Sequence, residues 1–273
     1  IMQSSNQASK QASKQANKQA SKQASKQAIK QSRSQANKQS SNQAIMKPSK
    51  QPDEFRKTAI RRLAQGYIDS GHFAGIEWLI KQHGEVIDAG FALPDGAPSS
   101  LPDRPIYRIY SMTKPIVSTA LMLLHETTDF RLQDPVATYL PAFGATQVLG
   151  ADGSLAPQAR PMEIRDLLTH TSGLTYDFME DTPVGQLYRD ARIMNDATRT
   201  LEEVIDVLAK IPLSSQPGSR WHYSLGIDVA ARLIEVLSGQ PLGDFLAERI
   251  FGPLGMTDTG FGVADSNLNR LSA

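Results

Sequence analysis

The sequence contains no cysteine among its 273 residues. This absence excludes disulfide bonds and thiolate catalysis, although it does not identify the cellular compartment. The longest apolar stretch, near residues 115–124, is well short of the roughly 20 residues that span a bilayer, so no membrane span is predicted. The first fifty residues also lack the apolar core of a secretory signal peptide, which favours a cytoplasmic location.

Acidic residues are absent from residues 1–50, which hold ten of the 29 lysines and arginines. The rest of the chain holds the other 19 basic residues and all 28 Asp and Glu, so it carries a net charge of about −9. The basic segment has no aromatic side chain on which a nucleic-acid base could stack. Nucleic-acid binding is therefore not predicted.

Histidines are few and scattered, at positions 72, 83, 125, 170 and 222. None of them has the spacing of a metal-binding pair such as His-x-x-x-His. The sequence therefore predicts neither a metal site nor a cofactor, and it does not indicate an oligomeric state.

Residues 1–52 form a low-complexity tail in which Gln-Ala-Ser-Lys repeats with small lapses from Asn6 to Lys30. The repeat has no apolar stripe to bury, so the tail is expected to be disordered. A second interpretation is an artefact of gene prediction, because a tandem AAGC tetranucleotide reads as Lys-Gln-Ala-Ser in succession. In that case Met46 is a candidate initiator, and the start at Ile1 would reflect read-through upstream of the true start.

A folded domain is predicted over residues 53–273. Near-helical spacing of apolar residues indicates a helix from about Asp53 to Gly71, and two apolar runs predict a β-hairpin at 73–81 and 86–92. A long apolar helix is expected to follow Tyr110 and to reach about Glu126.

The stretch of about 130–220 is broken by many prolines and is predicted to be an all-helical insert of short helices. Helices are also expected over residues 227–237, ended by Gly239, and from residue 241 to about 250.

The segment with the most distinctive chemistry is Ser111-Met112-Thr113-Lys114 followed by Pro115. Residues three apart share a helix face, and in a tighter first turn they eclipse each other. Proline is tolerated only in the opening turn of a helix, so the pair is expected at a helix N-terminus. Serine needs a base beside it to become a nucleophile, and this spacing places a lysine there.

A lysine that accepts the serine proton must first be neutral. Its ordinary pKa of about 10.4 lies about 3 units above neutrality, which corresponds to about 4–5 kcal/mol. Desolvation by the apolar residues 116–124 is one expected source of this energy. The other reading of Ser-x-x-Lys is a helix cap followed by a solvated lysine.

Around this motif the chain resembles the serine β-lactamase-like superfamily, in its class C β-lactamase and family VIII esterase branch, over about residues 73–261. The resemblance is carried in family order by residues 107–114, 132–136 with 139–141, 164–174, 217–218 with 221–224, and 253–259. It implies an α/β (α+β) fold in which an antiparallel sheet is flanked by helices and joined to an all-helical subdomain. The Ser-x-x-Lys motif is itself a signature of penicillin-binding enzymes.

The resemblance also implies roles for three residues. Ser111 matches the nucleophile that forms the acyl-enzyme, Lys114 its proton partner, and Tyr223 the tyrosine that acts as general base. A phenol could serve if a cation such as Lys114 holds it as phenolate. His170 and His222 fall in segments that are structural in this family.

Leu225 departs from the family pattern, because class C β-lactamases have an asparagine at this position. A leucine cannot hydrogen-bond the amide of an acylated β-lactam, so carboxylic esters are the expected substrates. A β-lactamase or a D-Ala-D-Ala peptidase is the alternative within the same fold. The expected partner is in either case a small-molecule ester or amide.

Family members continue past the segment at 253–259 into further strands of the sheet, one of which carries a third motif. The sequence ends at Ala273 without it. A C-terminally truncated chain that lacks these strands is therefore expected, and an inactive fragment is a third reading of the function.

Overall fold

A computed structural model describes residues 53–97, 104–179 and 182–272. The predicted tail at 1–52 lies outside the described residues. The chain divides into two compact units, Ile1–Ser100 and Leu101–Ala273, and each is described by itself. The domain boundaries expected from the sequence, 53–273 with an insert at about 130–220, stay a prediction.

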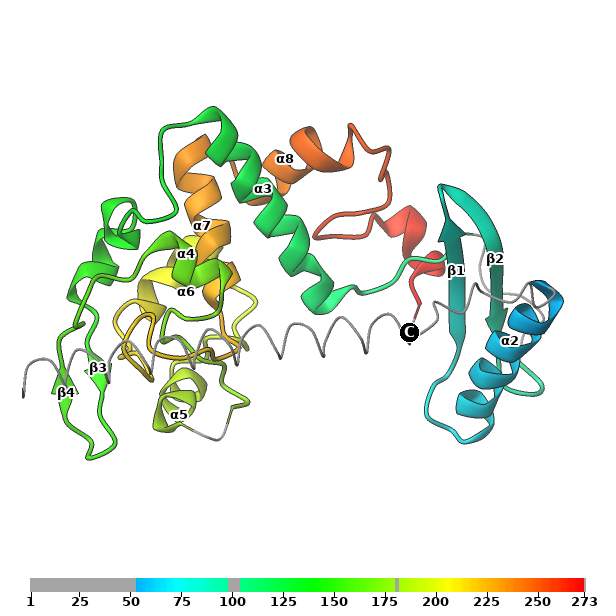
Figure 1. Ribbon diagram of the computed structural model, residues 1–273, viewed down its shortest axis with the longest axis horizontal. Helices are drawn as coiled ribbons and strands as arrows, with labels where there is room; N and C mark the ends of the chain where they lie inside the picture. Colours follow the sequence, from blue (N-terminus) through cyan, green and yellow to red (C-terminus); the bar gives the residue numbers. More distant parts are fainter. Residues whose placement is uncertain (1–52, 98–103, 180–181, 273) are drawn as a thin grey trace, which may run out of the picture. The chain divides into compact units, whose positions relative to one another are not determined.

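The described part of the first unit consists of one helix and one β-hairpin (Figure 1). Helix α2 spans Asp53–Asp69, and the antiparallel strands β1 (Ile76–Gln82) and β2 (Glu85–Ala92) follow it. Both elements were predicted at these places. The strands are joined by His83 and Gly84, whose φ angles of 51° and 86° are those of the mirror-image turns that match strand twist.

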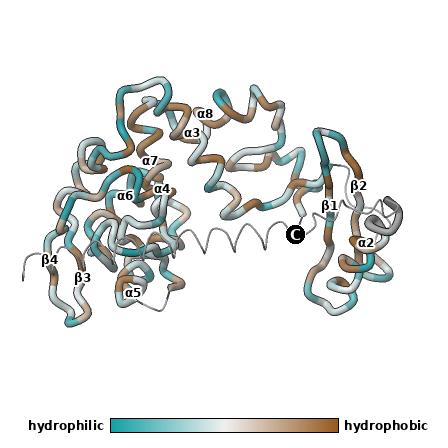
Figure 2. The backbone as a smooth tube through the Cα atoms, viewed as in Figure 1, coloured by the Kyte–Doolittle hydropathy of each residue, from teal (hydrophilic) through white to brown (hydrophobic). Residues whose placement is uncertain are grey.

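Alternation along the strands gives the hairpin two different faces. Hydrophobic residues occur along both strands (Figure 2). One face packs on α2 and forms a small core of Ala64, Ile68 and Ala92, with Ile76 and Trp78 beside it. The other face exposes Leu79, Ile87 and Phe91. Within the sheet, the Trp78 indole donates a hydrogen bond of 2.8 Å to the carboxylate of the buried Asp88.

The second unit is mainly helical in its described residues. Its helices are α3 (Thr113–Thr127), α4 (Ile164–Leu168), α5 (Pro183–Asp190), α6 (Leu201–Leu208), α7 (Gly226–Ser238) and α8 (Leu242–Leu246). A π-helical turn, Ala247–Phe251, continues α8. The long helix after Tyr110 and the helix expected at 227–237 are thus confirmed as α3 and α7.

The insert contains one feature that the proline-broken pattern did not predict. Two-residue strands β3 (Val148–Leu149) and β4 (Leu155–Ala156) pair as an antiparallel hairpin. Val148 also bridges to Leu213, which lies far along the chain. The expectation of short helices without strands was therefore wrong here, because runs of two residues are too short to show a period.

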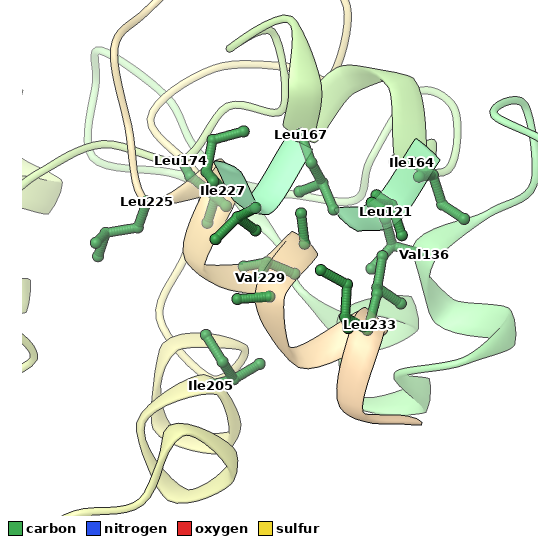
Figure 3. Close-up of a cluster of buried hydrophobic side chains, with 14 of the residues drawn as sticks. Leu121, Val136, Ile164, Leu167, Leu174, Ile205, Leu225, Ile227, Val229 and Leu233 are labelled. Carbon is green, nitrogen blue, oxygen red and sulfur yellow. The ribbon is translucent and has the colours of Figure 1, made fainter. Parts of the chain in front are cut away.

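Helix α7 is the centre of the hydrophobic core of this unit. Helices α3, α4, α6 and α8 all contact it. Its side chains Val229 and Leu233 are fully buried among Leu121, Ile164 and Leu167 from the surrounding elements (Figure 3). The helix ends where Gly239 adopts a left-handed φ of 71°, as the sequence predicted.

Gly226, the first residue of α7, lies close against the backbone of α4. A Cβ atom at Gly226 would lie 2.7 Å from the carbonyl oxygen of Leu167, which is backbone and cannot rotate away. The glycine therefore permits the contact that places the start of α7.

Replacing Gly226 by Ala is expected to lower the free energy of unfolding by about 1–3 kcal/mol, the usual cost of overpacking a core. Gly262→Ala is the matched control, since a Cβ there meets no atom within 4 Å. Urea unfolding of both variants measures the difference. Equal midpoints for the two variants would contradict the close approach of α4 and α7.

Candidate active site

Ser111 lies in a turn that is set just before a helix. Residues Tyr110–Met112 form a 3₁₀ turn, and α3 begins at the next residue, Thr113. Tyr110 has a φ of 42°, a left-handed conformation that is uncommon for a side chain of this size. Pro115 falls in the first turn of α3, where its missing N–H costs nothing.

Lys114 reaches back to Ser111, as the three-residue spacing predicted. The Nζ atom of Lys114 donates a hydrogen bond of 3.2 Å to the Oγ atom of Ser111. The 3₁₀ turn brings the two side chains onto one face, because residues three apart eclipse in that geometry.

Tyr223 comes to the same place from a distant part of the chain. Its hydroxyl donates a hydrogen bond of 2.8 Å to the Oγ atom of Ser111, across 112 residues of sequence. The ammonium of Lys114 lies 4.9 Å from the centre of its ring. The three residues expected from the family resemblance are therefore brought together at one atom, the Ser111 Oγ.

Tyr176 is a fourth member of this cluster that the sequence analysis did not single out. Its ring centre lies 5.2 Å from that of Tyr223 and 5.4 Å from the ammonium of Lys114. Tyr176 is buried, with 4% of its surface exposed, and stacks on Phe178 at 4.7 Å. The signal available in the sequence was its position two residues after Leu174, directly beyond the matched stretch 164–174.

The surroundings of Lys114 overturn the expectation that burial keeps its amine neutral. Burial does lower the pKa of Lys114, but hydrogen bonding to Tyr176 and Tyr223 outweighs burial and raises the pKa. The pKa of Tyr223 moves the other way and is lowered by hydrogen bonding with Lys114 and then with Ser111. Lys114 is thus favoured as an ammonium, and Tyr223 is the phenol that ionises more easily.

The two histidines near the cluster are held by backbone and hydroxyl groups. The Nε2 atom of His222 lies 2.8 Å from the Thr175 hydroxyl. His170 lies against Tyr223, at 4.9 Å between ring centres, and its Nδ1 atom accepts a hydrogen bond from the Ser224 amide. Burial and then the nearby ammonium of Lys114 lower the pKa of His170, so its ring stays neutral. Neither imidazole forms a hydrogen bond to Ser111 among the described residues.

A partly buried ion pair supports the turn that carries His170. The guanidinium of Arg160 donates two hydrogen bonds, of 2.7 and 2.8 Å, to the carboxylate of Asp166. The same carboxylate accepts from the hydroxyl of Thr171, the residue after His170. Burial raises the pKa of Asp166, but the hydrogen bonds from Arg160, the Glu163 amide and Thr171 outweigh burial and lower it.

Arg160→Leu is expected to lower the free energy of unfolding by about 2–4 kcal/mol, because it leaves the buried Asp166 charge without its main partner. The estimate is at the low end of the usual range because 34% of the Arg160 side chain is exposed. Arg165→Leu is the control, since this more exposed arginine pairs with Glu163 instead.

The effect of Arg160→Leu is also expected to depend on pH. A carboxyl whose folded pKa is depressed stabilises the fold above its unfolded pKa and loses that contribution as the pH falls through the folded value. The gap in stability between the parent protein and Arg160→Leu should therefore narrow below about pH 3.8, the ordinary value for Asp166. Urea unfolding at acid and neutral pH measures this gap, and a constant gap would contradict the pairing.

A pocket of about 660 Å³ opens at Ser111, and its lining includes Lys114, Tyr176 and Tyr223. Its remaining wall is mostly apolar, with Val117, Phe178, Met194, Leu201, Ile227, Ala231, Leu242 and Phe261. Helix α7 adds two carboxylates, Asp228 and Glu235. Glu235 accepts a hydrogen bond from the Leu242 amide, and burial raises the pKa of Asp228. The pocket can thus hold a largely apolar substrate against Ser111.

Leu225 does not line this pocket. Its side chain is 2% exposed and belongs to the hydrophobic core around α7 (Figure 3). The residue therefore contributes packing and offers no polar contact to a bound molecule.

Comparison with known proteins identifies the family. The family model described as β-lactamase matches residues 60–273, which is most of the chain. This protein belongs to the β-lactamase family. The serine β-lactamase-like fold expected from the sequence is thereby confirmed, and the helices and antiparallel pairs of the structure are consistent with it.

Two of the curated relatives have names that refer to esterases. Esterase EstB of Burkholderia gladioli is 35% identical over 196 residues, which cover 68% of this chain and 47% of that protein. Lovastatin esterase of Penicillium rubens is 34% identical over 169 residues, which cover 60% of this chain and 41% of that protein. The chain therefore spans less than half the length of these curated relatives.

Among solved structures, EstCE1, described as a hydrolase with promiscuous acyltransferase activity, matches with a TM-score of 0.66 and 31% identity. The match covers 80% of this chain and 56% of that one. The names of this structure and of the two curated relatives refer to ester hydrolysis, hydrolase activity or acyl transfer.

Within the described ranges, no group of three or more potential metal-ligating side chains occurs. No helix in these ranges is both long enough and apolar enough to cross a membrane.

Proposed function

We propose that this protein is a serine hydrolase that forms an acyl-enzyme on Ser111 and hydrolyses carboxylic esters. The observation that carries the proposal is the arrangement at one oxygen atom: the Tyr223 hydroxyl lies 2.8 Å and the Lys114 ammonium 3.2 Å from the Ser111 Oγ. This atom lies at a pocket whose walls suit an apolar acyl or alkyl group.

In the first half of the reaction, Tyr223 as phenolate takes the proton of the Ser111 hydroxyl while the Oγ atom bonds to the ester carbonyl carbon. The carbonyl π electrons move to the oxygen, and their return expels the alkoxide. The alkoxide receives the proton that Tyr223 had taken. The products of this half are the free alcohol and an ester of Ser111.

In the second half, a water molecule replaces the alcohol. Tyr223 takes a proton from the water as its oxygen bonds to the acyl carbon, and the Ser111 Oγ leaves with that proton. The carboxylic acid is released, and both side chains return to their starting states. An alcohol in place of water would make the same steps an acyl transfer.

Lys114 supports both halves through its charge. An ammonium beside the phenol stabilises the phenolate, because an opposite charge within a few ångströms favours the ionised form. The direction of the two pKa shifts, up for Lys114 and down for Tyr223, supports this division of roles.

Two features favour esters over β-lactams. Leu225 packs in the core and offers no amide to a bound lactam, and the relatives EstB and lovastatin esterase have names that refer to ester hydrolysis. A β-lactamase or peptidase remains the alternative, and faster turnover of a chromogenic cephalosporin than of a p-nitrophenyl ester would favour it.

The proposal is tested by trapping the acyl-enzyme. The protein is mixed with p-nitrophenyl butyrate, quenched in acid and measured by intact mass spectrometry. A mass increase of one butyryl group, mapped to the peptide that contains Ser111, is expected. If no adduct forms with this ester or with a fluorophosphonate, the chain is an inactive relict and the proposal is wrong.

A further inference from the structure

Two tyrosines, Tyr176 and Tyr223, contact the same lysine from different parts of the chain. The Lys114 ammonium lies 5.4 Å from one ring centre and 4.9 Å from the other. The two rings are also adjacent, at 5.2 Å. Of the two tyrosines, only Tyr223 forms a hydrogen bond to Ser111 among the described residues. The proposed function uses Tyr223 and leaves the role of Tyr176 open.

We propose that Tyr176 is a positioning residue that holds Lys114 as an ammonium beside Tyr223, so that Tyr223 and not Lys114 receives the Ser111 proton. This inference rests on the proposed function, because it concerns the same serine and the same proton.

The contacts of Tyr176 suit this role. A neutral phenol has lone pairs that accept from an ammonium and one O–H that it can donate. Hydrogen bonding between Tyr176 and Lys114 favours the charged lysine and raises its pKa. Hydrogen bonding between Tyr176 and Tyr223 favours the phenolate of Tyr223 and contributes to its lower pKa.

Burial decides which of the two phenols ionises. Tyr176 is 4% exposed and is stacked on Phe178, whereas Tyr223 is partly exposed at the pocket. Burial raises the pKa of Tyr176 and outweighs hydrogen bonding with Lys114, which lowers it, and the charge of Asp228 on α7 raises it further. Tyr176 therefore stays a neutral hydrogen-bonding group under conditions in which Tyr223 can lose its proton.

Other titratable groups near the pair do not provide the same support. His170 lies against Tyr223, but its ring stays neutral. Asp228 and Glu235 line the pocket from α7, and Tyr110 lines it from the turn before Ser111. Leu225, two residues after Tyr223, is buried in the core and has no polar group. Among these residues, Tyr176 is the one whose ring lies against both Lys114, at 5.4 Å, and Tyr223, at 5.2 Å.

The test is Tyr176→Phe, which removes one hydroxyl and keeps the ring that stacks on Phe178. The variant is acylated with p-nitrophenyl butyrate across a range of pH. In the plot of acylation rate against pH, the rise assigned to ionisation of Tyr223 is expected to move to higher pH by about one pH unit. This is the usual effect of losing one hydrogen bond to an ionised group. Acylation near neutral pH should fall about tenfold and recover on the high-pH plateau.

Tyr139→Phe is the matched control. The Tyr139 hydroxyl donates to Asp134 outside the pocket, so its loss should leave the acylation profile unchanged. If the acylation rate of Tyr176→Phe rises at the same pH as in the parent protein and acylation is otherwise normal, the inference is overturned. The proposed function would remain intact.

A second readout does not require activity. Near-ultraviolet absorbance of tyrosinate is followed through a pH titration of the parent protein, Tyr176→Phe and Tyr223→Phe. The titration of lowest pKa is expected to disappear in Tyr223→Phe and to move to higher pH in Tyr176→Phe. Its disappearance in Tyr176→Phe, or its persistence in Tyr223→Phe, would show that the assignment of the two phenols is wrong. This absorbance titration tests the inference even if no acyl adduct forms on Ser111.

Discussion

Ser111→Ala is expected to abolish the acyl adduct and to reduce ester hydrolysis by roughly 10⁴-fold or more, because removal of a nucleophile leaves only substrate binding and electrostatic stabilisation. The substitution removes the Oγ atom to which Tyr223 and Lys114 both donate. The site is otherwise kept, since Ser111 is not part of the hydrophobic core. Intact mass and initial rates with p-nitrophenyl butyrate measure both effects.

The control for this experiment is Ser219→Ala. The Ser219 hydroxyl donates to the Gln216 carbonyl and does not line the pocket, so its removal should leave adduct formation unchanged. Adduct formation that persists in Ser111→Ala would locate the nucleophile elsewhere and would contradict the proposed function.

Tyr223→Phe is expected to slow acylation of Ser111 by about 10²- to 10⁴-fold, the usual contribution of a positioned general base. The ring remains and can still pack on Tyr176 and His170, so the change is confined to the hydroxyl. Rapid-quench measurement of the adduct gives the acylation rate, and thermal unfolding shows whether the fold is kept.

The pH dependence separates this role from simple packing. With Tyr223 as base, the parent profile should rise through the pKa of this phenol, which is lowered by Lys114 and Ser111, and then level off. The Tyr223→Phe variant should lose this rise of the acylation rate with pH. If Tyr223→Phe is slower but keeps the rise, the proton transfer belongs to another group, with Lys114 as the first candidate.

Local pattern was sufficient for much of the fold. The hairpin of β1 and β2 was predictable because two apolar runs flank a short turn containing glycine. Helix α7 was predictable from its apolar spacing and from Gly239, which ends it in a left-handed conformation. The β3–β4 hairpin was not predictable, because each of its strands has only two residues and depends on the distant contact between Val148 and Leu213.

The sequence by itself determined the contact between Ser111 and Lys114, because a three-residue spacing in one turn places two side chains on one face whatever surrounds them. Tertiary structure alone decided the direction in which the pKa of Lys114 moves. Tyr176 and Tyr223 reach Lys114 from distant loops, and their phenols outweigh the desolvation that the apolar flank of α3 suggested. The balance between burial and hydrogen bonding depends on distances in space, and the spacing of residues along the chain does not contain them.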